Sequence, residues 1–210
     1  MDYTKKSYNL TRKDSNSILI GVFNIDSYSG PHIFENVHIA PLYSKTFHKQ
    51  FMWDTFNLLS VNNKIPLIIK PKIDDRYSSD KISTHNSEEY DCQALENLTD
   101  FKNPFYEKYI IIEEAQFFKD LFLFVIDQVE LRGKNVIVVG LDGDSDRENF
   151  GDIHKLIPLC DDIIKLKAYC SICKDGTLGI FSKRLSDKKD KILVGSEGDY
   201  IAVCRKCYLK

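Results

Sequence analysis

Short apolar runs, each bounded by charged or turn-forming residues, recur along the middle of this chain and constrain its fold more than any other feature. The runs at 65–70, 109–112 and 135–140 are rich in β-branched residues and have the length of strands buried on both faces. Between the second and third runs, residues 121–129 repeat apolar side chains at helical spacing. Strands that alternate with helices predict an α/β domain with a parallel sheet and right-handed crossovers.

Local signals refine the boundaries of these elements. Asp120 is placed to cap the helix that follows it, and Gly133 is placed to end that helix. We also expect a helix with a buried aromatic face, a single helical turn and two further strand-like segments. These elements are predicted at 47–61, 94–98, 18–23 and 37–39 respectively.

Composition narrows the class of protein. A net charge of −2 gives no overall attraction to nucleic acid or to an anionic membrane. No apolar run approaches the roughly 20 residues that span a bilayer, and residues 1–17 have no signal-peptide core. Asp2 and Asp14 argue against a mitochondrial presequence. We therefore expect an intracellular protein in a reducing compartment, with the cytoplasm preferred and the mitochondrion left open.

Four of the six cysteines form two Cys-x-x-Cys pairs near the C-terminus. Cys170 with Cys173, and Cys204 with Cys207, would supply the four soft ligands of a closed, structural zinc site. Two disulfides are the alternative, and a reducing compartment disfavours them. The zinc interpretation makes the segment between the pairs a loop or hairpin tethered at both ends, which can close over a ligand.

Two adjacent carboxylates, Glu113 and Glu114, end the run at 109–112. The carboxyl edge of an open parallel sheet is where ligands bind. In nucleotide-dependent phosphotransferases, one acid at this position holds magnesium and another takes a proton from the attacking hydroxyl. A plain strand end with solvated acids is the alternative, and this stretch by itself leaves both open.

Several stretches together resemble the type II thymidine kinases, a family that joins a P-loop α/β domain to a zinc-held lasso over the nucleoside. Residues 113–118, Glu-Glu-Ala-Gln-Phe-Phe, resemble the family's Asp-Glu-Gly/Ala-Gln-Phe-Phe. Residues 74–77 followed by 84–85 resemble its Asp-Thr-Arg-Tyr segment. Further matches follow in the family's order at 139–143, 150–151, 156–159, 170–173, 182–185, 194–195, 200 and 204–208. The resemblance covers residues 39–208.

This resemblance implies transfer of the γ-phosphoryl group from ATP to thymidine. Glu114 would accept the proton of the 5′-hydroxyl, and Glu113, where the family usually has Asp, would help to hold Mg²⁺. Asp74 and Arg76 would lie near the phosphoryl-transfer site. The slot for thymidine would consist of Phe117, Leu141, Phe150 and Tyr200, with main-chain groups near Val194 and Gly195 reading the base edge.

The phosphate loop departs from the family pattern, Gly-Pro-Met-Phe-Ser-Gly-Lys-Ser. Its counterpart at 40–46 reads Ala-Pro-Leu-Tyr-Ser-Lys-Thr, so it is shorter and lacks both glycines. Those glycines let main-chain N–H groups surround the phosphate, and without them Ser44, Lys45 and Thr46 would bind ATP poorly. A second departure is Ser145, which stands where the family has an aromatic residue that would stack on thymine.

We therefore interpret the chain as a thymidine-kinase-like protein with weak or no catalysis. It would then act as a structural or docking subunit of a larger assembly, or form a homo-oligomer. An active kinase of nucleotide salvage stays open because Glu114 is intact. Nucleic-acid binding through the zinc ribbon ranks last, because acids interleave with the basic residues there.

The predicted organisation has three parts: an N-terminal extension (1–32), a P-loop-like α/β domain with helices on both faces of the sheet (33–165), and a zinc-ribbon or lasso module (166–210). The strand at 18–23 either pairs with an exposed edge or a neighbouring subunit, or joins this domain's own core. The aromatic helix at 47–61 either packs against a partner protein or packs on this domain's own core.

Overall fold

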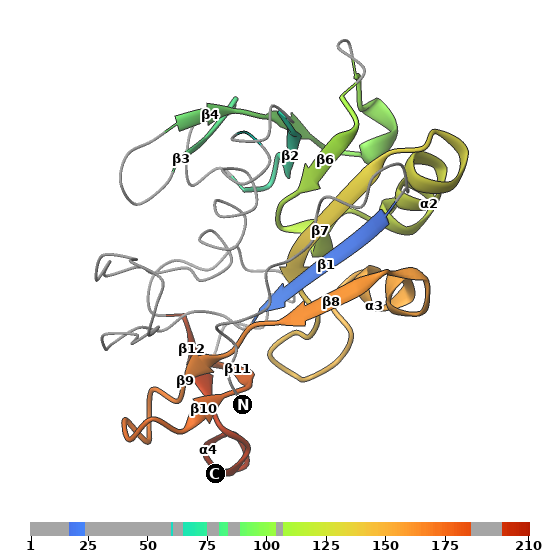
Figure 1. The fold of residues 1–210 in the computed structure, drawn as a ribbon. Coiled ribbons are helices and arrows are strands. Elements are labelled where there is room, and N and C mark those ends of the chain that lie inside the picture. Colours follow the sequence, from blue (N-terminus) through green and yellow to red (C-terminus); the bar gives the residue numbers. More distant parts are fainter. Residues whose placement is uncertain are drawn as a thin grey trace.

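The computed structural model describes residues 17–23, 60, 65–74, 80–83, 89–103, 107–185 and 199–210. For 17–23 and 83 it describes the backbone alone. Figure 1 shows a twisted sheet with helices beside it and a small module of hairpins at its lower end, which carries the C-terminus. The predicted boundary after residue 32 and the expected strand at 37–39 lie outside the described residues, and the three-part division of the chain stays a prediction.

The central sheet has six strands in the order β5-β2-β6-β7-β1-β8, and every pairing in it is parallel. This confirms the predicted α/β class. The strands are β1 (Ser17–Phe23), β2 (Leu67–Pro71), β5 (Gln93–Leu95), β6 (Tyr109–Ile112), β7 (Asn135–Leu141) and β8 (Asp162–Lys165).

Strand β1 lies inside the sheet, hydrogen-bonded to β7 on one side and to β8 on the other. Its last residue, Phe23, pairs with Leu141 of β7, and Val22 pairs with Lys165 of β8. Of the two interpretations of the segment at 18–23, the domain's own core is therefore correct and the exposed edge is wrong. The chain leaves β1 at the carboxyl edge of the sheet, since all six strands run the same way.

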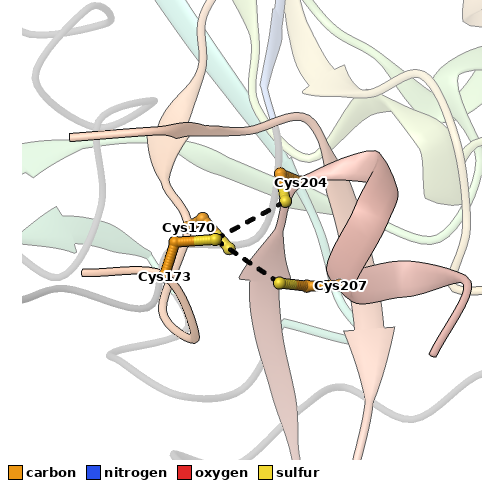
Figure 2. Close-up of side chains that lie close together, drawn as sticks. All are labelled: Cys170, Cys173, Cys204 and Cys207. Carbon is orange, nitrogen blue, oxygen red and sulfur yellow. Dashed lines mark hydrogen bonds between the residues drawn. The ribbon is translucent and has the colours of Figure 1, made fainter. Parts of the chain in front are cut away.

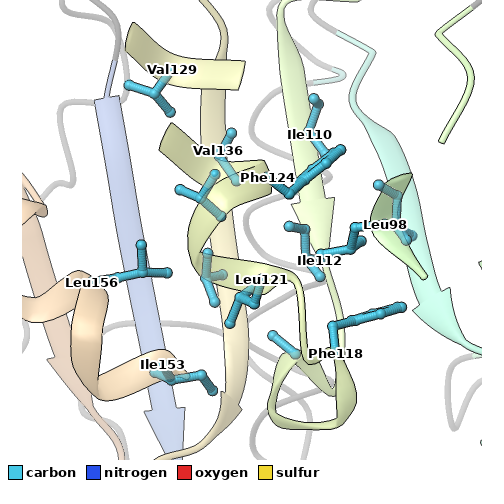
Figure 3. Close-up of a cluster of buried hydrophobic side chains, with 14 residues drawn as sticks. Leu98, Ile110, Ile112, Phe118, Leu121, Phe124, Val129, Val136, Ile153 and Leu156 are labelled. Atoms are coloured by element: carbon cyan, nitrogen blue, oxygen red, sulfur yellow. The ribbon is translucent and has the colours of Figure 1, made fainter. Parts of the chain in front are cut away.

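Side chains alternate along the strands and build a core on each face of the sheet. Ile110 and Ile112 of β6 point to the face covered by α2 (Leu121–Ile126) and α3 (Ile153–Leu156). Figure 3 shows Leu121, Phe124, Ile153 and Leu156 packed over the strand residues on this face. Each fully buried side chain of this kind contributes roughly 1.5–3 kcal/mol to stability, so this layer is a main source of the fold's stability.

Ile111 points to the opposite face, where the core includes Ile82 and Ile137. Ile82 belongs to the hairpin of β3 (Lys81–Ser83) and β4 (Glu89–Asp91), which covers this face in the described part of the chain. A helical layer on this face stays a prediction, because the expected helix at 47–61 is described only at Ser60, which is helical.

The helix after Asp120 differs in detail from its prediction. Asp120 occupies the N-cap position but its side chain does not cap; its Oδ2 accepts the main-chain N–H of Thr99 instead, at 2.9 Å. Helix α2 continues as a π-helical segment, η4 (Asp127–Leu131), before Gly133 adopts a φ of 67°. Gly133 therefore ends the helix as predicted, because this left-handed conformation favours glycine.

The helical turn expected at 94–98 is wrong. Residues Gln93–Leu95 form β5, which pairs in parallel with β2, and a short 3-10 helix, η2, follows at Leu98–Asp100. The main-chain groups of 93–95 bond to the open edge of β2, and this tertiary pairing overrides the local helical preference.

The C-terminal module consists of two small hairpins and one helical turn. Strand β9 (Ala168–Tyr169) pairs with β10 (Leu178–Gly179), and β11 (Phe181–Arg184) pairs with β12 (Tyr200–Val203), both antiparallel. The turn is α4 (Arg205–Tyr208). The tethered hairpin expected between the cysteine pairs is thus present. Among the described residues, no helix is long and apolar enough to cross a membrane.

Candidate functional site

The two acids that end β6 are buried at the carboxyl edge of the sheet. Glu113 is 1% exposed and Glu114 is 5% exposed. The main-chain N–H of Glu113 donates to the carbonyl of Ile69 at 2.8 Å, so the chain stays bonded to β2 one residue beyond the strand. Glu114 then adopts a left-handed conformation, with φ 48° and ψ 42°, and starts the short helix η3 (Ala115–Phe117). A non-glycine residue held in this region is strained, and such strain concentrates at functional sites.

Gln116 connects Glu114 to the neighbouring strand. Its Nε2 donates to Oε2 of Glu114 at 2.7 Å, and its Oε1 accepts the main-chain N–H of Leu141, the last residue of β7, at 3.0 Å. Gln116 is itself 4% exposed. A single buried amide therefore joins the acid that follows β6 to the end of β7. The sequence pattern contains Gln116 within a motif but assigns it no role.

Two glycines make room for Gln116. A Cβ on Gly140 would lie 2.5 Å from Oε1 of Gln116 and 2.7 Å from Cδ1 of Ile153. A Cβ on Gly151, whose φ is 63°, would lie 2.3 Å from the main-chain oxygen of Gln116. Gly151 thus requires glycine, because a Cβ there would meet main-chain atoms, whereas a Cβ on Gly140 would displace the ends of two side chains.

Further charged groups are buried where β2 ends. Asp74 is 3% exposed, and its main-chain N–H donates to the carbonyl of Pro71 at 3.0 Å. Lys70 is 2% exposed and its Nζ donates to the carbonyl of Lys81 at 3.2 Å. Burial raises the pKa of the Cys92 thiol to about 11, and the charges of Lys70 and Glu113 also act on that thiol. Lys70 of β2 and Glu113 after β6 therefore lie close enough to act on the same buried thiol. Sequence reasoning missed Lys70; a lysine inside an apolar strand was the available signal.

The structure brings together three of the four side chains expected to hold thymidine. The rings of Phe117 and Phe150 meet edge to face, with centroids 5.5 Å apart. Leu141 is bonded to Gln116, the neighbour of Phe117. The loop after Leu141 returns to Phe150, whose main-chain N–H donates to the carbonyl of Asp142 at 3.2 Å. Tyr200 is on β12, in the C-terminal module, where the Arg184 guanidinium lies 5.7 Å from its ring centroid.

An ion pair flanks the end of β1. Lys165 of β8 contacts the Asp142 carboxylate just beyond β7, and β1 lies between these two strands. The sequence predicts no role for Asp142 or Lys165, because their contact depends on the position of β1 between β7 and β8.

The four paired cysteines converge in the C-terminal module. Their sulfur atoms all lie within 4.8 Å of one another, and Sγ of Cys173 is 3.8 Å from that of Cys204 and 3.5 Å from that of Cys207. Figure 2 shows the two pairs facing each other, one from the turn after β9 and the other from the start of α4. All six cysteines of the chain are free thiols.

This cluster fits a tetrahedral metal ion. Sulfurs about 2.3 Å from one ion would be about 3.8 Å apart, close to the spacing around Cys173. Burial opposes ionisation of Cys170, but main-chain N–H groups of Cys204, Cys173 and Ile172 outweigh it and lower the Cys170 pKa to about 6. The thiol hydrogen bond with Cys207 raises the Cys173 pKa to about 12. Because thiol ligands must lose their protons to bind a soft metal ion, the metal affinity of this cluster should fall as the pH is lowered.

The comparisons with known proteins agree with this geometry. The family model described as "Thymidine kinase" matches residues 41–208. The chain belongs to the thymidine kinase family. The match spans both the acids after β6 and the cysteine cluster, and it begins after β1.

Individual thymidine kinases show the same relationship. The chain is 38% identical over 148 residues to a thymidine kinase of Oryza sativa, a match that covers 68% of this chain and 54% of the rice protein. It is 35% identical over 155 residues to that of Mycoplasma mobile, covering 73% and 76%. With that of vaccinia virus it is 37% identical over 149 residues, covering 67% and 78%. The match thus spans only about half of the rice protein's length.

Several predicted site residues of this thymidine kinase family member lie outside the described part of the chain. These are Ser44, Lys45 and Thr46 of the expected phosphate loop, Arg76 after β2, and Val194 and Gly195 of the expected lasso. Their roles stay predictions. The described part of the candidate site contains Glu113, Glu114 and the aromatic pair Phe117 and Phe150, whose roles also stay predictions.

Proposed function

We propose that this chain transfers a phosphoryl group from Mg²⁺-ATP to thymidine, with Glu114 as the general base, at a rate limited by its altered phosphate loop. The observation that carries the proposal is the burial and bonding of Glu114 at the carboxyl edge of the sheet. A base of this kind needs a fixed position within hydrogen-bond reach of the substrate hydroxyl. Membership of the thymidine kinase family supplies the reaction class.

The other residues take roles around this base. Glu113 and Asp74, both buried, would hold Mg²⁺, and Arg76 would neutralise charge on the transferred phosphoryl group. Phe117, Leu141 and Phe150 would hold thymine, closed by Tyr200 and by the main chain at Val194 and Gly195. Mg²⁺ supplies charge neutralisation at the phosphates. The cysteine cluster would hold a structural Zn²⁺.

Weak catalysis is the finer part of the proposal. A shortened loop at 40–46 without its glycines offers fewer main-chain donors to the ATP phosphates through Ser44, Lys45 and Thr46. Each well-placed donor at a developing charge is worth about 3 kcal/mol. Ser145 also lacks an aromatic face, and its carbonyl is engaged by Tyr208 at 2.6 Å. The chain would then keep Glu113 and Glu114 but bind ATP with lower affinity.

The test is a direct assay for thymidine monophosphate with Mg²⁺-ATP and thymidine. We expect slow turnover with a high KM for ATP, and a further loss of about 10²–10⁴-fold in Glu114→Gln. Glu130→Gln, at an exposed acid of η4, is the matched control and should keep wild-type turnover.

A repaired loop tests the reason for the slow rate. Ala40→Gly combined with a glycine inserted between Ser44 and Lys45 should raise kcat/KM for ATP while leaving the affinity for thymidine unchanged. No turnover in either the wild type or the repaired protein would contradict a kinase and favour the non-catalytic docking subunit.

A further inference from the structure

The backbone conformation of Glu114 does not by itself fix the direction of its carboxylate, so neighbouring residues must orient it. The residue sits at a single left-handed position between β6 and η3, so no regular element fixes its carboxylate. A general base loses effect when its reacting atom is misplaced, and a shift of about 1 Å can cost about 10²-fold in rate. Some other contact must therefore hold the carboxylate in place.

The contact from Gln116 meets this need because its own orientation is fixed. A main-chain N–H can donate only to the oxygen of an amide, so the Leu141 N–H, 3.0 Å from Oε1, turns the Nε2 of Gln116 toward Glu114. That Nε2 donates to Oε2 of Glu114 at 2.7 Å. One oxygen of the Glu114 carboxylate is thereby bonded to the Gln116 amide.

The surroundings of Gln116 keep the amide from moving. The side chain is 4% exposed and lies against Gly140, where any Cβ would approach Oε1 to 2.5 Å. Its main chain lies against Gly151, where a Cβ would approach to 2.3 Å. Leu141, which orients the amide, also lines the proposed thymidine slot. The Gln116 side chain therefore connects Glu114, the proposed base, to Leu141 in the wall of the proposed nucleoside pocket.

We propose that Gln116 is a positioning residue that fixes the carboxylate of Glu114 for proton abstraction. This inference rests on the proposed function. A purely structural glutamine would matter only through its bond to Leu141. A positioning glutamine must also present a donor to Glu114, and these two requirements can be separated by substitution.

The substitution Gln116→Glu separates the bond to the Leu141 N–H from the donor presented to Glu114. The new side chain keeps the length of glutamine and an oxygen for the Leu141 N–H, but its carboxyl group either repels the ionised Glu114 or shares with it the proton site that Glu114 needs as a base. We expect kcat to fall about 10²-fold with little change in the Kd for thymidine. Gln116→Met, which loses both bonds, should show the same fall in kcat and a lower Tm.

Gln128→Met is the matched control. Gln128 is also a buried glutamine, 6% exposed, and its Nε2 bonds to Asp127 at 3.0 Å on η4, away from the acids. Its substitution should lower Tm and leave kcat unchanged. Wild-type kcat in Gln116→Glu, or an equal loss of kcat in Gln128→Met, would overturn the inference.

A second readout separates this inference from the proposed function. If Glu114→Gln and the wild type are equally inactive, the kinase proposal fails, and crystal structures of the wild type and Gln116→Met then decide. The Glu114 carboxylate should rotate away from residue 116 in the variant. A carboxylate that keeps its wild-type position would refute a positioning role even in an inactive protein.

Discussion

The phenol of Tyr208 donates a hydrogen bond to the main-chain carbonyl of Ser145, 2.6 Å away. This bond joins the C-terminal module to the loop after β7, because Tyr208 directly follows Cys207 of the cysteine cluster. The Arg147 guanidinium of the same loop lies 4.4 Å from the Tyr208 ring centroid. The loop begins after Leu141 and ends at Phe150. The contacts of Tyr208 with Ser145 and Arg147 therefore connect the cysteine cluster to the proposed nucleoside slot.

Removing this phenol should loosen the loop. Tyr208→Phe deletes one partly buried hydrogen bond, and we expect a loss of about 1 kcal/mol of stability. Hydrogen exchange at the Asp146 and Glu148 amides, which both donate to Oδ1 of Asp144 at 2.9 Å, should become faster. Tyr169→Phe, in β9 of the same module, is the control. Equal exchange rates in Tyr208→Phe and the wild type would show that the bond does not restrain the loop.

Loss of the metal should disorganise the same region. The four thiols lie within 4.8 Å of one another, so a Zn²⁺ ion there would hold the turn after β9 to α4. We expect zinc to copurify with the protein, and chelation or Cys173→Ser to lower Tm and speed amide exchange in 168–185 and 199–208. Cys160→Ser, outside the cluster, should retain the metal. A zinc-free protein with an unchanged Tm would contradict a structural metal site.

Gly151 should tolerate alanine far less well than another glycine with positive φ. Gly176 has a φ of 87°, and a Cβ added there would have no atom within 4 Å, whereas a Cβ on Gly151 would lie 2.3 Å from the carbonyl oxygen of Gln116. Gly176→Ala should therefore cost about 1 kcal/mol from backbone strain alone. Gly151→Ala should cost about 3 kcal/mol or more, because strain and a backbone clash add. Urea unfolding of both variants measures the difference, and equal costs would refute the close packing at Gln116.

Cys92 should react slowly with alkylating reagents in the folded protein. Burial raises its pKa from the ordinary value of 9.0 to about 11, so its thiolate is scarcer in the folded state than in the unfolded state at any pH below 9. Because the thiolate is the reactive form, alkylation at pH 8 should be roughly 100-fold slower than in the denatured chain. Mass spectrometry of the Cys92 peptide after iodoacetamide treatment gives both rates. Similar rates in the two states would mean that the thiol is not buried beside Lys70 and Glu113.

The chemistry of the candidate site was readable from residue type and order, but its connections were not. Glu113 and Glu114 follow a strand directly, so their place at the edge of the sheet follows from local sequence. Gln116 bonds to a residue 25 positions later in the chain, and Lys165 to one 23 positions earlier. Contacts of this separation depend on how the strands are ordered, which no local pattern contains.

The sequence by itself determined the α/β class, the cysteine cluster and the acids after β6, because each depends on hydrophobic period or on ligand spacing within a few residues. Only the tertiary structure decided that 17–23 lies between β7 and β8, that 93–95 is a strand rather than a helical turn, and that Asp120 bonds to Thr99. The physical reason is the same in each case. Main-chain and polar groups bond to whichever partner the fold brings near them, and that partner is distant in the sequence.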